Sequence, residues 1–277
     1  MDRNKNGIIV RLSAGNIQEE KNSLPGKIAA LIKSSINQSS INSKSLYSFY
    51  VIELNENDLT LPIEAKEFTK ERFIHYLEDL DLRIAFYIRS KNSVISTDRS
   101  SRKKAKDEIK KAGKLIENIE PKGFNIPLIC HVGGAKGNRK KSMVEFCKFF
   151  DDLNKNTRDR ICIINDDKPS LYSVKDLLSF TYVEKKIPIV FRTNSYKTNA
   201  GGLTYKESLF LASSTWAERD NPIIIYCPYD KDSTISQGDL NPYNLTIDIV
   251  YDNKIPEPVT FTAEAGGSDE YTFKGKL

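Results

Sequence analysis

The stretch Leu128-Ile129-Cys130-His131-Val132-Gly133-Gly134 is the most informative segment of the chain. It begins as a short apolar run, which predicts a buried strand, and it reaches one of only two histidines just before a pair of glycines. A basic helix start follows the glycines. We therefore expect His131 to lie at the end of a strand, beside a tight loop.

Seven similar β-branched or aromatic runs accompany this one. They recur at intervals of roughly 25 to 45 residues, which are too long for hairpins and long enough for a crossover helix each time. Several runs, such as Ile161-Cys162-Ile163-Ile164, are continuously apolar, a pattern typical of parallel strands covered on both faces. The eight predicted strands span 7–12, 48–54, 83–89, 128–132, 161–165, 188–193, 222–227 and 245–251.

Helical patterns fill the gaps between the strands. The predicted helices span 27–36, 69–80, 102–119, 141–153, 173–184 and 205–216. Alternation of strand and helix predicts an α/β fold, a single-domain (β/α)8 TIM barrel over residues 1–258, with residues 259–277 as a C-terminal hairpin or tail. An open doubly wound sheet is the alternative fold.

Composition limits the class of protein. The length of 277 residues suits one such barrel, and 39% apolar with 29% charged residues is typical of a soluble globular protein. We expect an intracellular protein in a reducing compartment, because we find neither a signal peptide nor a long apolar run, and the four cysteines lack metal-like spacing. A net charge of +5 is too small to establish a polyanionic partner.

The loop after His131 is a candidate phosphate cradle. Its glycines present backbone amides at a loop-to-helix junction, with cations beside them, although the spacing is not that of a Walker motif. A tight loop with a solvated basic tip is the alternative. A basic helix near 99–114 would add to a positive rim. The candidate phosphate or nucleic-acid ligands are Gly133, Gly134, Lys136, Asn138, Arg139, Lys140, Lys141 and Arg102.

Two acidic residues and His131 are candidates for a metal site. His131 is either a metal ligand or an imidazole with a structural hydrogen bond, and we favour the structural role. Asp166 and Asp167 could hold one weakly bound Mg²⁺, but an acidic pair after a strand more often caps the next helix or binds a nearby Lys or Arg.

Several strand-end blocks resemble those of UV-damage endonucleases in order and spacing. These blocks are Cys130-His131-Val132-Gly133-Gly134, Ile163-Ile164-Asn165-Asp166-Asp167-Lys168, Ile187-Pro188-Ile189-Val190-Phe191, Thr215-Trp216 and Pro222-Ile223-Ile224-Ile225-Tyr226. The resemblance covers roughly residues 83–226. It implies a TIM barrel of the xylose isomerase and endonuclease IV-like superfamily, and a DNA repair activity that nicks 5′ to a lesion with a cluster of divalent metals.

The departures from the family pattern fall on its metal ligands. A histidine of the third strand is Tyr87 here, a glutamate of the fifth is Ile164, and an aspartate of the sixth is replaced by Arg192. A Lys-x-His pair of the seventh strand becomes Ile223 and Ile225. What the resemblance leaves for metal is His131, Asp166 and a C-terminal glutamate, Glu264, or less favourably Asp252. A cluster of divalent ions needs several carboxylates and imidazoles. This small set therefore predicts that metal-dependent phosphodiester cleavage is lost or reduced.

We therefore predict a diverged UV-damage endonuclease-like protein with lost or reduced metal-dependent phosphodiesterase activity, which acts in nucleic-acid binding or assembly. The alternatives are an active metal-dependent repair endonuclease and a barrel that binds a small phosphorylated ligand. Catalytic residues are not assigned. No cofactor is expected, with residual Mn or Mg as the alternative. DNA or a protein is the expected partner, and a membrane is not.

Overall fold

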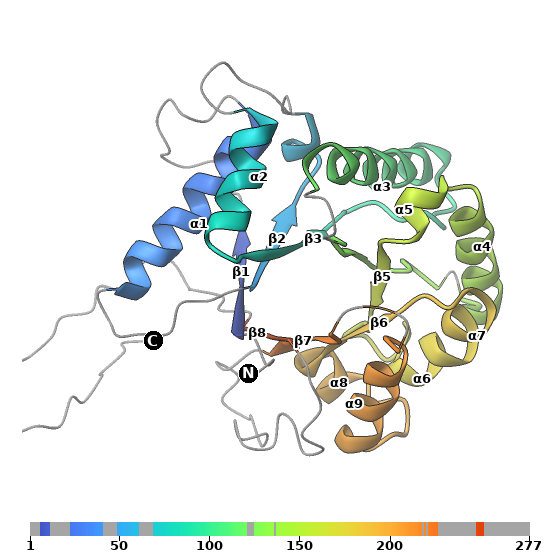
Figure 1. The fold of residues 1–277 in the computed structure, drawn as a ribbon. Coiled ribbons are helices and arrows are strands. Elements are labelled where there is room, and N and C mark those ends of the chain that lie inside the picture. Colours follow the sequence, from blue (N-terminus) through green and yellow to red (C-terminus); the bar gives the residue numbers. More distant parts are fainter. Residues whose placement is uncertain are drawn as a thin grey trace, which may run out of the picture.

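Eight parallel strands form a closed barrel in sequence order in the computed structural model (Figure 1). The structure describes residues 6–11, 23–40, 49–60, 69–120, 125–135, 137–217, 219, 221–226 and 248–251. The strands are β1 (Asn6–Arg11), β2 (Phe49–Leu54), β3 (Arg83–Ile88), β4 (Leu128–Cys130), β5 (Ile161–Ile164), β6 (Ile189–Arg192), β7 (Ile223–Tyr226) and β8 (Asp248–Tyr251). The predicted (β/α)8 barrel is confirmed.

Closure rests on the pairing of the first and last strands. In this ladder Gly7 is the partner of Val250, and Ile8 is the partner of Tyr251. An open doubly wound sheet would leave these strands as free edges, so the alternative fold is wrong.

The strands are buried on both faces, as their unbroken apolar runs predict. In β2, Phe49 and Val51 belong to the core inside the barrel, whereas Tyr50 and Ile52 pack in the layer between strands and helices. The inner core also contains Tyr87 from β3 and Trp216, whose indole Nε1 donates to the carbonyl of Ile189 at 2.8 Å. The barrel is therefore a packed core and not a pore.

Helices surround the barrel on its outside (Figure 1). Several begin at a capping side chain: Thr69, Asp98, Asn138 and Thr204 each accept a hydrogen bond from a backbone N–H of the first turn. The helical elements are α1 (Leu24–Ser40), η1 (Asp58–Thr60), α2 (Lys70–Asp79), α3 (Arg99–Ile119), α4 (Arg139–Asp151), α5 (Lys155–Arg158), α6 (Val174–Leu177), η2 (Leu178–Tyr182), α7 (Val183–Lys185), α8 (Thr193–Thr198) and α9 (Tyr205–Ser214).

The helix predicted over 173–184 is interrupted. After α6 the chain forms η2, a π-helical turn, before it returns to α-helix as α7. The next residue, Lys186, has a φ of 55° in the left-handed region. The short helices α5 and α8 were not predicted, because neither is long enough to show an apolar period.

Helices α3 and α5 approach one another at a glycine. A Cβ atom placed on Gly113 would lie only 2.2 Å from Oγ1 of Thr157. The absence of a side chain at this position therefore permits the close packing of the two helices.

Three further findings concern the cysteines, membrane spans and the C-terminal segment. Cys130, Cys147 and Cys162 are free thiols. No helix in the described ranges has the length and apolar character to cross a bilayer. The predicted C-terminal tail over 259–277 lies outside the described residues, as does Cys227.

Candidate site at the carboxyl ends of the barrel strands

The imidazole of His131 is held between two side chains. Its Nε2 lies 2.8 Å from the hydroxyl of Tyr87, and its Nδ1 lies 2.8 Å from Oδ1 of Asp166. An ionised carboxylate only accepts hydrogen bonds, so Nδ1 carries the proton and donates to Asp166. The other ring nitrogen then accepts from Tyr87. The structure thus shows His131 at the end of β4 in a continuous chain of hydrogen bonds.

Tyr87 is suited to its role as a donor. Its side chain lies inside the barrel, and this burial raises the pKa of the hydroxyl to about 12. Charges of both signs act on the same hydroxyl: Arg192 and Arg89 lower its pKa, whereas Glu53 and Asp166 raise it. The phenol consequently stays protonated at neutral pH and can donate to His131.

Asp166 is fixed from several directions. Its backbone N–H donates to the carbonyl of Tyr172 at 2.9 Å, and its own carbonyl accepts from Nδ2 of Asn199 at 3.2 Å. The same amide group also donates to the carbonyl of Lys168 at 3.0 Å. Oδ2 of Asp166 is buried without a hydrogen-bond partner. Asp166 therefore orients the imidazole through Oδ1.

The described residues do not fit a cluster of divalent metals. Both ring nitrogens of His131 are already engaged, and the described part of the chain contains no group of three or more His, Cys, Asp or Glu side chains that could hold an ion. Ile164 and Ile225 are buried near the ends of β5 and β7. Arg192 brings a positive charge close enough to act on Tyr87, and such a charge repels a cation. Glu264, the remaining candidate ligand, lies outside the described residues.

A cavity of about 370 Å³ opens beside His131. Its polar lining comes from the loops after β3, β4 and β5 and includes the exposed cations Lys91 and Lys168. Ala105 and Ile109 of α3 form part of its apolar wall. The remaining lining residues are Ile88, Ser90, Asn92, Ser93, Val94, Cys130, Gly133, Gly134, Asp166, Asp167 and Leu171.

The glycine loop lines this cavity, and two backbone amides in this region donate to groups of the protein itself. The N–H of Gly134 donates to Oγ of Ser93 at 3.3 Å, and the N–H of Asn138 donates to the carbonyl of Ala135 at 2.8 Å. Oδ1 of Asn138 in turn accepts from the N–H of Lys141 at 2.9 Å and so caps α4. Side-chain cations, more than backbone amides, are what this loop region offers to a phosphate.

The basic candidates divide into two groups. Arg102 donates to the carbonyl of Ser96 at 2.7 Å, and Arg139 binds the carbonyls of Pro169 and Ser170 and the carboxylate of Asp176, so both hold the structure together. Lys140 and Lys141 are exposed at the start of α4. Lys136 lies outside the described residues.

Sequence reasoning missed several members of the site. Tyr87 drew attention only as the replacement of a histidine, and Lys91, Ser93 and Asn199 drew none. The available signal was position, since Lys91 and Ser93 come within four residues of the end of the strand predicted over 83–89. Asn199 gave no such signal, because it lies after the short helix α8.

The comparison with protein families decides the relationship. A sequence model described as UV-endonuclease UvdE matches residues 64–237, well over half of the chain. The chain belongs to the UV-endonuclease UvdE family. Among curated proteins, none matches this UvdE-family protein in sequence.

Solved structures agree on the fold of this UvdE-family protein. SacUVDE is 20% identical with a TM-score of 0.65, and the alignment covers 90% of this chain and 92% of that one. A D-allulose 3-epimerase from Methylomonas sp. is 14% identical with a TM-score of 0.57, covering 91% of this chain and 84% of its own. An L-ribulose 3-epimerase is 8% identical with a TM-score of 0.60, covering 90% and 81%. At these identities the similarity establishes the barrel fold and not the reaction.

Proposed function

We propose that this UvdE-family barrel binds nucleic acid at the carboxyl face of its strands and has lost or reduced the metal-dependent phosphodiesterase activity that the resemblance to UV-damage endonucleases implies. The observation that carries the proposal is the engagement of both His131 ring nitrogens, one by Tyr87 and one by Asp166. An imidazole in this state has no lone pair to give to a metal.

If His131 became a metal ligand, one of its two hydrogen bonds, to Tyr87 or to Asp166, would be lost. If Nε2 turned to a metal, the buried hydroxyl of Tyr87 would lose its acceptor, at a cost of about 1–3 kcal/mol. If Nδ1 did so, Asp166 would lose the donor that pairs with Oδ1. A phosphodiesterase centre also needs further anionic ligands for charge balance, and Ile164 supplies none.

Nucleic-acid binding is supported by the cations around the cavity. Lys91 and Lys168 line it, and Lys140 and Lys141 are exposed at the start of α4, which follows the glycine loop. Lysine side chains that neutralise phosphates release counterions, which makes the affinity fall with salt. The polar groups beside them, including Asn92 and Ser90, could contact sugars or bases.

A nicking assay tests the loss of catalysis. Supercoiled plasmid, either UV-irradiated or partly abasic, is incubated with Mn²⁺ and an excess of the protein. We expect no nicked product above the protein-free control. Nicks that increase with protein concentration and disappear with a chelator would contradict the proposal and restore an active endonuclease.

A binding assay with matched variants tests the interface. Fluorescence anisotropy of a labelled duplex should show salt-dependent binding that Lys91→Glu/Lys168→Glu weakens at least tenfold, with a salt slope smaller by about two. The control is Lys114→Glu/Lys148→Glu, which makes the same charge change at exposed positions in the C-terminal halves of α3 and α4. Equal loss in both double variants, or binding insensitive to salt, would defeat the proposal.

A small phosphorylated ligand is the second candidate, and the volume of the cavity favours it. About 370 Å³ falls in the range of roughly 300–1,000 Å³ that small-molecule sites occupy. Ribose 5-phosphate is a suitable probe. The second candidate replaces the first if ribose 5-phosphate binds the wild-type protein, binds the Lys91→Glu/Lys168→Glu variant more weakly, and the protein does not bind DNA.

A further inference from the structure

A second pocket lies at the opposite end of the barrel, near the amino ends of β4, β5 and β6. Its volume is about 510 Å³. Thr215, one of its lining residues, accepts a hydrogen bond from the N–H of Ile189 at the start of β6. Asn125 lines it from the segment before β4. We call this cavity the basal pocket, since the candidate site described above lies at the carboxyl ends of the strands.

The charge of the basal pocket is strongly one-sided. Its lining contains one carboxylate, that of Asp159, which is already bonded to Nζ of Lys155 at 2.7 Å. The cations of the lining are Lys155, Arg158, Lys185, Lys186 and Arg219. Like charges around one cavity repel each other unless an anion balances them, so the lining favours an anionic ligand.

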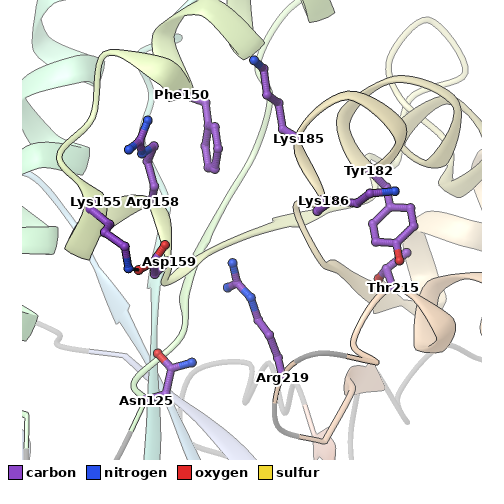
Figure 2. A pocket seen from close by; sticks show the side chains of 10 residues that line it. All are labelled: Asn125, Phe150, Lys155, Arg158, Asp159, Tyr182, Lys185, Lys186, Thr215 and Arg219. Atoms are coloured by element: carbon purple, nitrogen blue, oxygen red, sulfur yellow. Dashed lines mark hydrogen bonds and ion pairs between the residues drawn. The ribbon is translucent and has the colours of Figure 1, made fainter.

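The cations that line the pocket come from separate parts of the chain. Figure 2 shows Arg219 extending between Arg158 on one side and Lys186 with Tyr182 on the other. Nη1 of Arg219 donates to the carbonyl of Ile161 at 3.2 Å, which fixes the direction of the guanidinium. The planar group has further N–H donors for a ligand, and a guanidinium suits the bidentate recognition of phosphate oxygens.

The local backbone adds independent support. Tyr182 is the last residue of the π-helical turn η2, and such turns are rare and occur frequently at functional sites. Lys186 ends α7 with a φ of 55°, a conformation that glycine adopts more easily than lysine. Its ammonium lies 4.8 Å from the centroid of the Tyr182 ring. A charged residue thus holds a position at the pocket where an uncharged glycine would be easier to accommodate.

We propose that the basal pocket binds a small molecule that carries a diphosphate or triphosphate group. The volume is large enough for more than one anionic group, and the cations lie on different walls, as successive phosphates require. Lys185 bonds the carboxylate of Asp151 at 2.7 Å, and Nη1 of Arg158 donates to the Asp151 carbonyl at 3.4 Å. Lys186, Arg219 and the remaining N–H donors of Arg158 are therefore the main ligands. This site is independent of the proposed function, which concerns the other end of the barrel.

Calorimetry with inorganic pyrophosphate tests the proposal. At low ionic strength we expect saturable binding by the full chain, stronger than that of orthophosphate or sulfate. Arg158→Gln and Lys186→Gly should each weaken it about tenfold. Lys186→Gly is informative because it relieves the left-handed strain, so weaker binding cannot come from a damaged fold.

The control is Lys33→Gln/Lys206→Gln, which removes two charges from exposed positions in α1 and α9 that line neither pocket and should leave pyrophosphate binding unchanged. The proposal is overturned if orthophosphate and pyrophosphate bind equally, or if Lys186→Gly and Arg158→Gln have no effect. A short single-stranded oligonucleotide that displaces pyrophosphate with the same sensitivity to both variants would also overturn it, in favour of a nucleic-acid site.

Discussion

Asn165 and Arg192 exchange two hydrogen bonds across the ends of β5 and β6. The N–H of Arg192 donates to Oδ1 of Asn165 at 2.7 Å, and Nδ2 of Asn165 donates to the carbonyl of Arg192 at 3.1 Å. The side-chain amide thereby extends the pairing of the two strands beyond the ladder in which Ile164 is the partner of Val190. Asn165 is fully buried, so this contact is shielded from water.

Replacing Asn165 with alanine should destabilise the protein by about 3 kcal/mol. Both backbone groups of Arg192 would lose their partner at a buried position, and an unmet buried hydrogen bond costs about 1–3 kcal/mol. The free energy of unfolding in urea measures the effect. Asn156→Ala, at an exposed position in α5, is the control and should change stability by less than about 0.5 kcal/mol. Equal effects of the two substitutions would contradict this account.

Tyr87→Phe should change the stability of the protein at alkaline pH. Burial raises the pKa of Tyr87 from 10.0 to about 12, so between these values the unfolded state binds fewer protons than the folded state. The stability contributed by this group is complete below pH 10 and is lost as the pH rises towards 12. The variant lacks the titrating group, so its urea midpoint should fall less over this interval. Parallel pH profiles would show that Tyr87 is not responsible.

Gly133 and Gly134 should respond differently to alanine. Gly133 has a φ of 106°, and a Cβ there would lie 2.1 Å from Oγ of Ser93, whereas a Cβ on Gly134 meets nothing within 4 Å. Backbone strain alone should destabilise Gly133→Ala by roughly 1–3 kcal/mol. Thermal unfolding compares the two variants, with Gly134→Ala as the matched control close to wild type. A larger loss in Gly134→Ala would refute the geometry of this loop.

Gly113→Ala should be destabilising although alanine is the better helix former. The added Cβ would meet Thr157 at the crossing of α3 and α5, which outweighs a gain in helix propensity of about 1 kcal/mol. Thr157→Ala removes the two nearest atoms and should recover part of the loss in the double variant. A double-mutant cycle on unfolding free energies measures this coupling. Additive effects would show that the two residues do not compete for space.

The strands could be predicted because each is a compact, continuously apolar run between polar connections. Ile161–Ile164 and Ile223–Tyr226 have this pattern. The pattern does not depend on whether the metal ligands of the family are present. The interruption at η2 could not be predicted, because a π-helical turn changes the backbone register without placing a glycine or proline in Leu178–Tyr182. Periodicity detects the presence of a helix better than its internal geometry.

Only part of the candidate site could be predicted, because the sequence shows which residues are present but not which distant residues they contact. The exchange of metal-binding residues for Tyr87 and Arg192 was visible in sequence, but their new partners were not, since Tyr87 and His131 are 44 residues apart. Arg139 shows the same limit: two of its acceptors are backbone carbonyls, at Pro169 and Ser170, which no residue type reveals. Contacts of this kind depend on how distant loops converge once the barrel has formed.

The pairing of β1 with β8 has a consequence for any attempt to shorten the protein. The family-matched region, residues 64–237, includes β3 through β7 but neither β2 nor the two strands that meet to complete the ring. Excised alone, that region would be a curved ribbon with rows of bare amide and carbonyl groups along β3 and β7, open to pairing with other chains. The region that matches the family model therefore depends on strands outside it to remain soluble.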